Sequence, residues 1–433
     1  MVYGILIILI EVILMGNCLV LLTKVYPFDK GEEFIEDEIK ELSYAFDKVV
    51  LIATSTADNA VMTRKVPENF EVYRIKASFV KKQIIKNSVK LFFTGKDKEY
   101  ILNEEKEAVK GSLKKRAYLE YFLAKGISVY DKCDEILKST DISSYESITF
   151  YSYWLYDTAL AAIKLNKLYS NKMKKVVSRA HRYDLYADKN SMNYLPLRYY
   201  LLENLDAVYP CSEDGSSYLR ELYPRYSHKI ETSYLGTRDH GIAELRNYNE
   251  YTIASCCHVS AVKRVDLLAK SLKFLNDDPD VKIRWIHFGD GDGLDEIKAY
   301  AEENLTNINV DFKGNVKNAE LMNYYKNESI NLFVNTSSSE GLPVSIMEAC
   351  SFGIPIIATD VGGTSEIVIE NKTGMLLDVN FKPEVLSEKI KKMAMMSREE
   401  QMNYRKRCRE FWQEHFFGEN NFKKFTNNIR ADK

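Results

Sequence analysis

Two carboxylates stand on either side of the start of an expected helix, in the segment NTSSSEGLPVSIMEACSFG. The first, Glu340, comes just before a Gly-Leu-Pro turn, and the second, Glu348, lies inside the helical stretch 344–352 that Gly353 closes. An ionised carboxylate accepts two hydroxyl hydrogens, so one can bind the hydroxyls of a sugar and the other a ribose diol. The spacing therefore predicts a site for a nucleotide sugar.

The elements around these carboxylates predict how such a site is built. The run INLFVN, residues 330–335, is short and apolar, which is typical of a buried parallel strand. The turn that follows it leads into a helix N-terminus, where unpaired amides and the helix dipole favour a phosphate group. The turn residues that we expect to bind the donor are Gly341, Leu342, Pro343, Val344 and Ser345.

Short apolar runs alternate with longer amphipathic stretches along most of the chain. They fall at 48–54, 147–153, 175–180 and 206–212, and the rhythm restarts at Tyr251. Such a βαβ rhythm predicts an α/β fold with two Rossmann-like, doubly wound parallel-sheet domains that face each other across a cleft. Ligands of open parallel sheets bind at the carboxyl ends of the strands, so the site should lie in that cleft.

The polar segment 236–251 is the expected joint between the two domains. We therefore divide the chain into an apolar N-terminal extension, an acceptor-side domain, a nucleotide-sugar-binding domain and terminal helices that return toward the first domain. The corresponding ranges are 1–14, 15–240, 241–410 and 411–433.

The two carboxylates with their turn, and the GIPIIATDVGGTSEIV that follows, resemble family 4 of the retaining glycosyltransferases, which have the GT-B fold. The resemblance implies that Glu340 contacts the donor sugar and that Glu348 binds the ribose of the nucleotide. The alternative is a pair of glutamates on a solvated helix edge. The flanking strand, the turn and the Gly362-Gly363 pair argue against it.

The resemblance also assigns cations for the donor diphosphate at the start of the second domain. Lys263, in SCCHVSAVKRVDLLAKSL, falls on the family's lysine position and would stabilise the leaving nucleotide. The family's usual arginine is replaced by His258, which carries no fixed charge, and Arg264 is expected to contribute instead. The alternative for Lys263 is a solvated lysine at a helix start.

Three further positions follow from the same resemblance. His181, in KKVVSRAHRYDLY, lies just past a buried strand where the family has a histidine facing the anomeric centre of the donor. A lone histidine is more often structural, but the SRAH motif favours a catalytic role. Gly31 resembles the glycine of the first loop, which approaches the donor phosphates, although a plain turn is the alternative.

The run Gly289-Asp290-Gly291-Asp292 resembles the family's glycine turn, so Gly289 and Gly291 are expected to line the base and ribose pocket. The two aspartates imitate a D-x-D metal motif, but the resemblance gives them no metal role, and we expect no metal and no cofactor. Seven cysteines without a C-x-x-C pair predict reduced cytosolic thiols rather than zinc sites or disulfides. A net charge of −2 gives no case for nucleic acid.

The first residues, Val2 to Leu14, are almost wholly apolar. They lack the basic start and cleavage site of a signal peptide and are shorter than the roughly 20 residues of a membrane span. An extension outside the working fold and a membrane-contacting segment both remain open. The basic stretch 64–98 is either a solvated amphipathic helix or a contact with anionic lipid.

These observations together predict a retaining, metal-independent glycosyltransferase that moves a sugar from a UDP- or GDP-sugar to a glycan or lipid-linked acceptor. We expect it in the cytoplasm or at the inner face of the cell membrane, in the synthesis of surface or capsular polysaccharide. Two alternatives stay open. One is a nucleotide-sugar epimerase or hydrolase on the same fold, and the other is a non-catalytic partner subunit.

Overall fold

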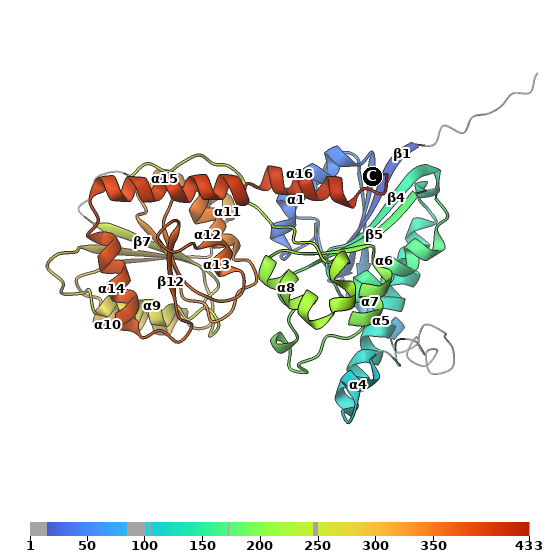
Figure 1. Ribbon diagram of the computed structural model, residues 1–433, viewed down its shortest axis with the longest axis horizontal. Helices are drawn as coiled ribbons and strands as arrows, with labels where there is room; N and C mark the ends of the chain where they lie inside the picture. The colour runs from blue at the N-terminus through green and yellow to red at the C-terminus, as the bar shows by residue number, and fades with distance from the viewer. Residues whose placement is uncertain are drawn as a thin grey trace, which may run out of the picture.

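The computed structural model of the protein describes residues 15–84, 101, 103, 105–171, 173–245 and 250–432. The predicted N-terminal extension and part of the basic stretch, residues 85–98, lie outside the described residues. The described chain forms two α/β domains, each with one sheet (Figure 1).

The first sheet has six strands in the order β3-β2-β1-β4-β5-β6, and all of its pairings are parallel. Its strands are β1 Met15–Thr23, β2 Lys48–Thr56, β3 Phe70–Lys76, β4 Tyr145–Ser152, β5 Met173–Ala180 and β6 Ala207–Pro210. The second sheet also has six parallel strands, in the order β12-β11-β10-β7-β8-β9. Its strands are β7 Tyr251–Cys256, β8 Ile283–Phe288, β9 Asn309–Gly314, β10 Leu332–Asn335, β11 Ile356–Thr359 and β12 Gly374–Leu377.

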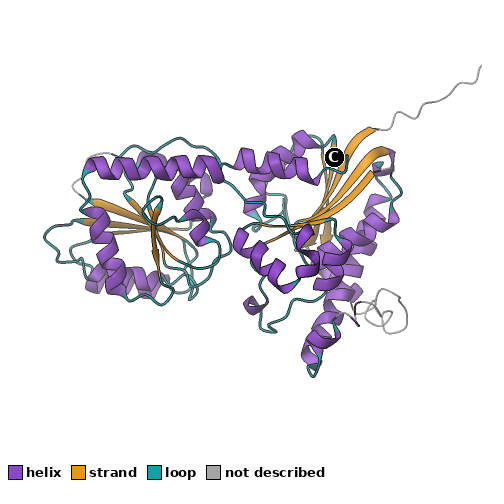
Figure 2. Ribbon diagram, viewed as in Figure 1, coloured by secondary structure: helices purple, strands orange, loops and turns teal. Residues whose placement is uncertain are grey.

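Helices cover both faces of each sheet (Figure 2). In the first domain they are α1 Glu36–Ala45, α4 Lys106–Val109, α5 Leu113–Leu137, α6 Asp157–Leu168, α7 Arg198–Asn204 and α8 Glu213–Leu222, and residues 77–84 are also helical. In the second part of the chain they are α9 Val265–Lys273, α10 Leu294–Asn304, α11 Asn318–Asn327, α12 Val344–Ser351, α13 Thr364–Ile367, α14 Pro383–Ala394, α15 Arg398–His415 and α16 Gly418–Ile429.

Strand β1 shows why a continuous apolar run is needed at the centre of such a sheet. Val20 and Leu22 pack into the core on one face, and Leu19 and Leu21 pack into the core on the other. Successive side chains of a strand point to opposite faces, so a strand with helices on both sides must be apolar at every position. The predicted fold class, two Rossmann-like parallel-sheet domains, is confirmed.

The last two helices connect the domains. Helix α15 lies along the second domain, and α16 continues onto the first domain beside α1 (Figure 1). Phe425 and Ile429 of α16 belong to the same buried cluster as Ile39 and Leu42 of α1. The C-terminal helix therefore completes the core of the domain that the N-terminal strand begins.

The two chain segments that cross between the domains bind each other. The Thr237 amide donates to the Phe416 carbonyl over 3.1 Å, and the Gly418 amide donates to the Thr237 carbonyl over 3.0 Å. A Cβ on Gly236 would lie 2.4 Å from the Cα of Gly418. Glycine is needed here because the two backbones pass too close for a side chain.

Candidate active site

Lys263 and Glu340 form an ion pair between the loops that follow β7 and β10. The Lys263 Nζ donates to Glu340 Oε1 over 2.6 Å, and their side chains are 27% and 10% exposed. Asn335, the last residue of β10, donates from Nδ2 to the same oxygen over 3.2 Å. The carboxylate predicted to bind the sugar and the cation predicted to bind the diphosphate are thus in direct contact.

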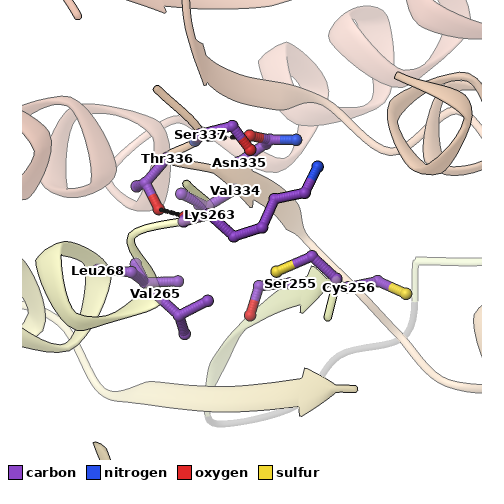
Figure 3. Close-up of a pocket in the computed structure, with 10 residues that line it drawn as sticks. Ser255, Cys256, Lys263, Val265, Leu268, Val334, Asn335, Thr336 and Ser337 are labelled. Atoms are coloured by element: carbon purple, nitrogen blue, oxygen red, sulfur yellow. Dashed lines mark hydrogen bonds between the residues drawn. The ribbon is translucent and has the colours of Figure 1, made fainter. Parts of the chain in front are cut away.

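A small hollow lies beside this pair, between the ends of β7 and β10. Figure 3 shows Lys263 extending past Cys256 toward Asn335. Ser337 donates its amide to Asn335 Oδ1 over 2.9 Å, which fixes the amide side chain in position. Lys263 and Asn335 line the hollow, and the Glu340 carboxylate contacts both of them. An ammonium and an amide can bind phosphate oxygens, and a carboxylate can bind hydroxyl groups.

Arg264 binds main-chain carbonyls. Its Nε donates to the Thr336 carbonyl over 2.8 Å, and its two terminal nitrogens donate to the carbonyls of Val379 and Ser337 over 2.6 and 3.2 Å. Thr336 Oγ1 in turn donates to the carbonyl of Lys263 over 3.0 Å. Arg264 therefore holds the loop of Lys263 against the loop of Glu340. Its expected contact with donor phosphates stays a prediction.

The turn after Glu340 is packed tightly against the glycine pair that follows β11. The Gly363 amide donates to the Gly341 carbonyl over 2.7 Å. Gly362 has a φ of 54°, and a Cβ there would lie 2.2 Å from the Glu340 carbonyl oxygen. Because these positions are glycines, the backbone after β11 can pack directly against the backbone of Glu340 and Gly341.

Helix α12 starts directly after this turn. Leu342 is buried in the core of the second domain, and Pro343 is the N-cap, with its carbonyl accepting from the Ile346 amide over 3.1 Å. The amides of Val344 and Ser345 belong to the first turn, which has no intrahelical acceptors for its N–H groups. Leu342 thus anchors the turn, and the two following amides are available to an anion.

Glu348 lies one turn further along α12 and is half-buried. Its Oε1 accepts from Asn318 Nδ2 over 2.7 Å. Burial raises the pKa of Glu348 to about 7, the Asn318 hydrogen bond opposes this rise, and the negative charge of Asp37 adds to it. Asp37 belongs to α1 of the first domain and pairs with Arg238, so Glu348 faces the other domain.

The loops after β7 and β8 lie side by side. The Val259 amide donates to the Asp290 carbonyl over 2.9 Å. Gly289 and Gly291 have φ values of 136° and 154°, and a Cβ on either would lie within about 2 Å of a carbonyl oxygen of the neighbouring loop. His258 is exposed on that loop. Both glycines are therefore needed for the close packing of the two loops. Their role in lining the donor pocket stays a prediction.

Asp290 and Asp292 are exposed in the same turn, and Asp290 Oδ1 accepts from the Gly291 amide over 2.8 Å. Within the described part of the chain, no cluster of three or more His, Cys, Asp or Glu side chains has the arrangement of a metal site.

His181 follows β5 and is only 7% exposed. Its ring packs against Phe34, Tyr153 and Trp154, with centroid distances of 5.1, 4.9 and 4.7 Å. Neither ring nitrogen has a hydrogen-bond partner in the described structure. Burial, helped by the charge of Arg179, lowers the pKa of His181 to about 3. The imidazole is therefore neutral near pH 7, with one donor and one acceptor unused.

The first loop supports this histidine through a residue that the sequence did not reveal. Glu32, next to Gly31, is buried and accepts from the amides of Lys24 and Val25 over 2.9 and 2.7 Å. Its Oε1 also accepts from Trp154 Nε1 over 2.5 Å. Gly31 has a φ of 114°, which favours glycine. Glu32 thus links the glycine loop to the aromatic wall of the histidine.

Two contacts join the domains at the site. Arg182, next to His181, donates from Nε to Ser339 Oγ over 3.1 Å, one residue before Glu340. Glu366 of α13 accepts from the amides of Glu213 and Asp214, the first residues of α8, over 2.7 and 2.9 Å. The carboxyl ends of the two sheets therefore face each other. Only its place in the GGTSE motif distinguished Glu366 in the sequence.

Residues 241–411 match the family model described as "Glycosyl transferases group 1". Within curated proteins, the chain is 34% identical over 90 residues to a GDP-mannose-dependent alpha-mannosyltransferase of Mycolicibacterium smegmatis, covering 21% of this chain and 22% of that protein. It is 30% identical over 129 residues to the O-antigen biosynthesis glycosyltransferase WbnH of Escherichia coli, covering 30% of this chain and 34% of that protein. The match thus spans about a fifth to a third of these relatives.

The fold is similar to solved structures over nearly the whole chain. One is HepE of Anabaena in complex with UDP, with 14% identity, a TM-score of 0.61 and coverage of 95% of this chain and 99% of that one. Another is sucrose-phosphate synthase of Thermosynechococcus elongatus, with 16% identity, a TM-score of 0.66 and coverage of 95% and 98%. These similarities establish the two-domain GT-B fold.

Proposed function

We propose that this protein is a glycosyltransferase that transfers a sugar from a nucleotide-sugar donor to a glycan or lipid-linked acceptor, with retention of anomeric configuration, as in family 4. The observation that carries the proposal is the contact of Lys263 with Glu340 at the start of α12, opposite the loop of His181. Similarity to O-antigen and Vi polysaccharide biosynthesis proteins supports a role in surface polysaccharide synthesis.

The donor is a UDP- or GDP-sugar in this proposal. HepE was solved with UDP and with UDP-glucose, and the mycobacterial relative is GDP-mannose-dependent. The ammonium of Lys263 and the first amides of α12 supply positive charge for the diphosphate, so the proposal requires no metal ion. Glu340 would bind the sugar hydroxyls and Glu348 the ribose diol.

In the transfer step, the bond from the anomeric carbon to the diphosphate oxygen breaks and the acceptor hydroxyl attacks from the same face of the sugar. The hydroxyl proton passes to the departing phosphate oxygen. Glu340 already accepts from Lys263 and Asn335, which suits it to orient the sugar rather than to form a covalent intermediate. His181, neutral and without a hydrogen-bond partner among the described residues, would bind the sugar from the first domain.

We place this activity in the cytoplasm or at the inner face of the cell membrane, where a lipid-linked acceptor would be held. None of the described helices combines the length and the apolar character that a bilayer crossing requires. In the basic stretch, Lys81 and Lys82 are exposed on the helical residues 77–84 and could contact anionic lipid.

The test is a screen of the purified protein against UDP-, GDP- and ADP-sugars in the presence of EDTA, by thermal shift and by nucleotide release. One donor should stabilise the protein and release nucleotide slowly. Glu340→Ala should abolish nucleotide release while the nucleoside diphosphate still binds. Glu302 is exposed, and Glu302→Ala should behave like the unchanged protein. Unaltered release by Glu340→Ala would refute the assignment of the site.

A non-catalytic partner subunit is the second candidate, because His258 replaces the family's usual arginine and is exposed on its loop. In that case no donor would be hydrolysed by any form of the protein, although nucleotide binding could persist. Fast release of nucleotide and free sugar that no acceptor changes would instead favour a hydrolase, and conversion of the donor into an epimeric nucleotide sugar would favour an epimerase.

A further inference from the structure

The cations of the second domain leave the charge of a donor diphosphate incompletely balanced. Lys263 is paired with Glu340, and each nitrogen of the Arg264 guanidinium donates to a main-chain carbonyl. His258, at the family's arginine position, carries no fixed charge. A diphosphate is doubly charged and gains further charge as its bond to the sugar breaks, so the proposed function calls for another cation.

Arg182 is a half-buried cation of the first domain that lies against the loop of Glu340. Its Nε donates to Ser339 Oγ over 3.1 Å, and a Cβ on Gly341 would lie 3.3 Å from the Cβ of Arg182. The Cζ of Arg182 also lies 5.4 Å from the ring centroid of Tyr183, within the range of a cation–π contact. Contacts with both domains therefore hold this guanidinium at the cleft.

The two terminal nitrogens of Arg182 have no hydrogen-bond partner and no carboxylate partner among the described residues. They retain accessible surface, so a ligand in the cleft can reach them. A guanidinium presents its N–H groups as a planar fork that fits two oxygens of a phosphate. The unpaired side of Arg182 is thus suited to an anion.

Arg182 and Lys263 contact adjacent residues of one loop. The guanidinium binds Ser339 and the ammonium binds Glu340, and the Cα atoms of neighbouring residues are ~3.8 Å apart. Two cations, one from each domain, therefore lie at the same part of the cleft.

We propose that Arg182 binds the β-phosphate of the nucleotide-sugar donor from the first domain. This inference rests on the proposed function, in which Glu340 binds the sugar and Glu348 binds the ribose. The phosphate attached to the sugar is then the one nearer to Glu340, and hence to the guanidinium. Arg182 supplies the fixed charge that His258 lacks, and it stabilises the leaving nucleotide as negative charge develops on the β-phosphate.

The test measures the affinity of the purified protein for UDP, GDP, UMP and GMP by isothermal titration calorimetry. Arg182→Gln should weaken binding of the diphosphate that the unchanged protein prefers by roughly 10- to 100-fold, because a charged hydrogen-bond donor is lost. The corresponding monophosphate lacks the β-phosphate, so its affinity should change by less than about threefold, which also shows that the variant is folded. Arg182→Lys should recover part of the affinity, since lysine keeps the charge but not the fork.

Two further variants separate anion binding from a purely structural role. Ser339→Ala removes the hydrogen bond to Arg182 but keeps the guanidinium, so the diphosphate affinity should fall by less than about threefold. Arg225→Gln removes the same charge from a side chain that is 70% exposed, and should leave the affinity unchanged. An equal loss in Ser339→Ala and Arg182→Gln would mean that Arg182 acts only by joining the domains, and would overturn the proposal.

Equal diphosphate affinity of Arg182→Gln and the unchanged protein would also overturn the proposal. A loss seen with UDP-glucuronate but not with UDP or UDP-glucose would do the same, because the guanidinium would then bind a carboxylate of the sugar. Failure of the proposed function has a different result. The unchanged protein would then bind none of the four nucleotides and release no nucleotide from any donor, which would refute the proposed function and this inference together.

Discussion

Replacing Glu348 by glutamine should stabilise the protein at alkaline pH while weakening donor binding. Glu348 is half-buried with Asn318 as its hydrogen-bond donor, and burial raises its pKa from 4.5 to about 7. In the unfolded chain the pKa returns to its ordinary value. Ionisation of this carboxyl therefore opposes folding, and the isosteric amide of Glu348→Gln removes that opposition.

The pH window follows from the two pKa values. Below about pH 4.5 the carboxyl is protonated in both states and costs nothing. Stability is lost as the pH rises through 4.5 toward 7, because the unfolded chain ionises first. The difference between these two pKa values corresponds to a loss of about 3 kcal/mol in the free energy of unfolding. Partial exposure of the side chain reduces this loss to about 1 to 2 kcal/mol.

For a domain of this size, 1 kcal/mol moves the melting temperature by roughly 2 to 4 °C. Glu348→Gln should thus melt about 4 °C above the unchanged protein at pH 8 and within about 1 °C of it at pH 5. Differential scanning calorimetry at four pH values between 5 and 8 measures this, with Glu302→Gln, on an exposed position, as the control. An equal shift at pH 5 and pH 8, or a lower melting temperature at pH 8, would refute the reasoning.

The same substitution should raise the KM for the donor. A carboxylate accepts both hydroxyls of a ribose diol, whereas an amide has one accepting oxygen. Loss of one hydrogen bond to a charged group costs about 1.5 to 3 kcal/mol, or roughly 10- to 100-fold in KM. Initial rates at varied donor concentration separate this effect from kcat, which should change much less.

Three other substitutions test the contacts around the cleft. Lys263→Met should lower kcat by roughly 100- to 1,000-fold, and Lys263→Arg should recover part of it, as measured by single-turnover transfer. Glu366→Ala removes two charge-assisted bonds to the start of α8, so small-angle scattering should show a larger radius of gyration and donor affinity should fall about tenfold. Glu38→Gln leaves the fully buried guanidinium of Arg179 without its carboxylate, so denaturant unfolding should show a loss of about 3 to 5 kcal/mol.

The two-sheet fold could be predicted because its central strands are buried on both faces and are therefore apolar at every position. Strand β3, FEVYRIK, was missed because it lies at the edge of the first sheet and exposes Glu71 and Lys76. Its sequence lies within a basic stretch that was interpreted as helical. Strand β12, GMLL, was not among the predicted strands.

The sequence indicated where the loops of the site lie but not which hydrogen bonds join one loop to another. Parallel strands bring their carboxyl ends to one edge, so the loops of Lys263 and Glu340 were expected on the same side. The role of Arg264 depends on carbonyls that lie about 70 and 115 residues away along the chain. A sequence shows a cation but not the carbonyl acceptors that surround it in the fold. The hydrogen bond from Trp154 to Glu32 was likewise not visible in the sequence.

In the proposed function, the ion pair of Lys263 and Glu340 would determine the order in which the site assembles around a donor. While the two side chains bind each other, the carboxylate has one oxygen engaged and the ammonium is neutralised. A diphosphate brings two negative charges to the same ammonium and competes with Glu340 for it. The carboxylate oxygen that is released can then accept a sugar hydroxyl, so the sugar contact strengthens only when the nucleotide is present. A free sugar or a nucleoside without phosphates should therefore bind this site much more weakly than the two parts joined.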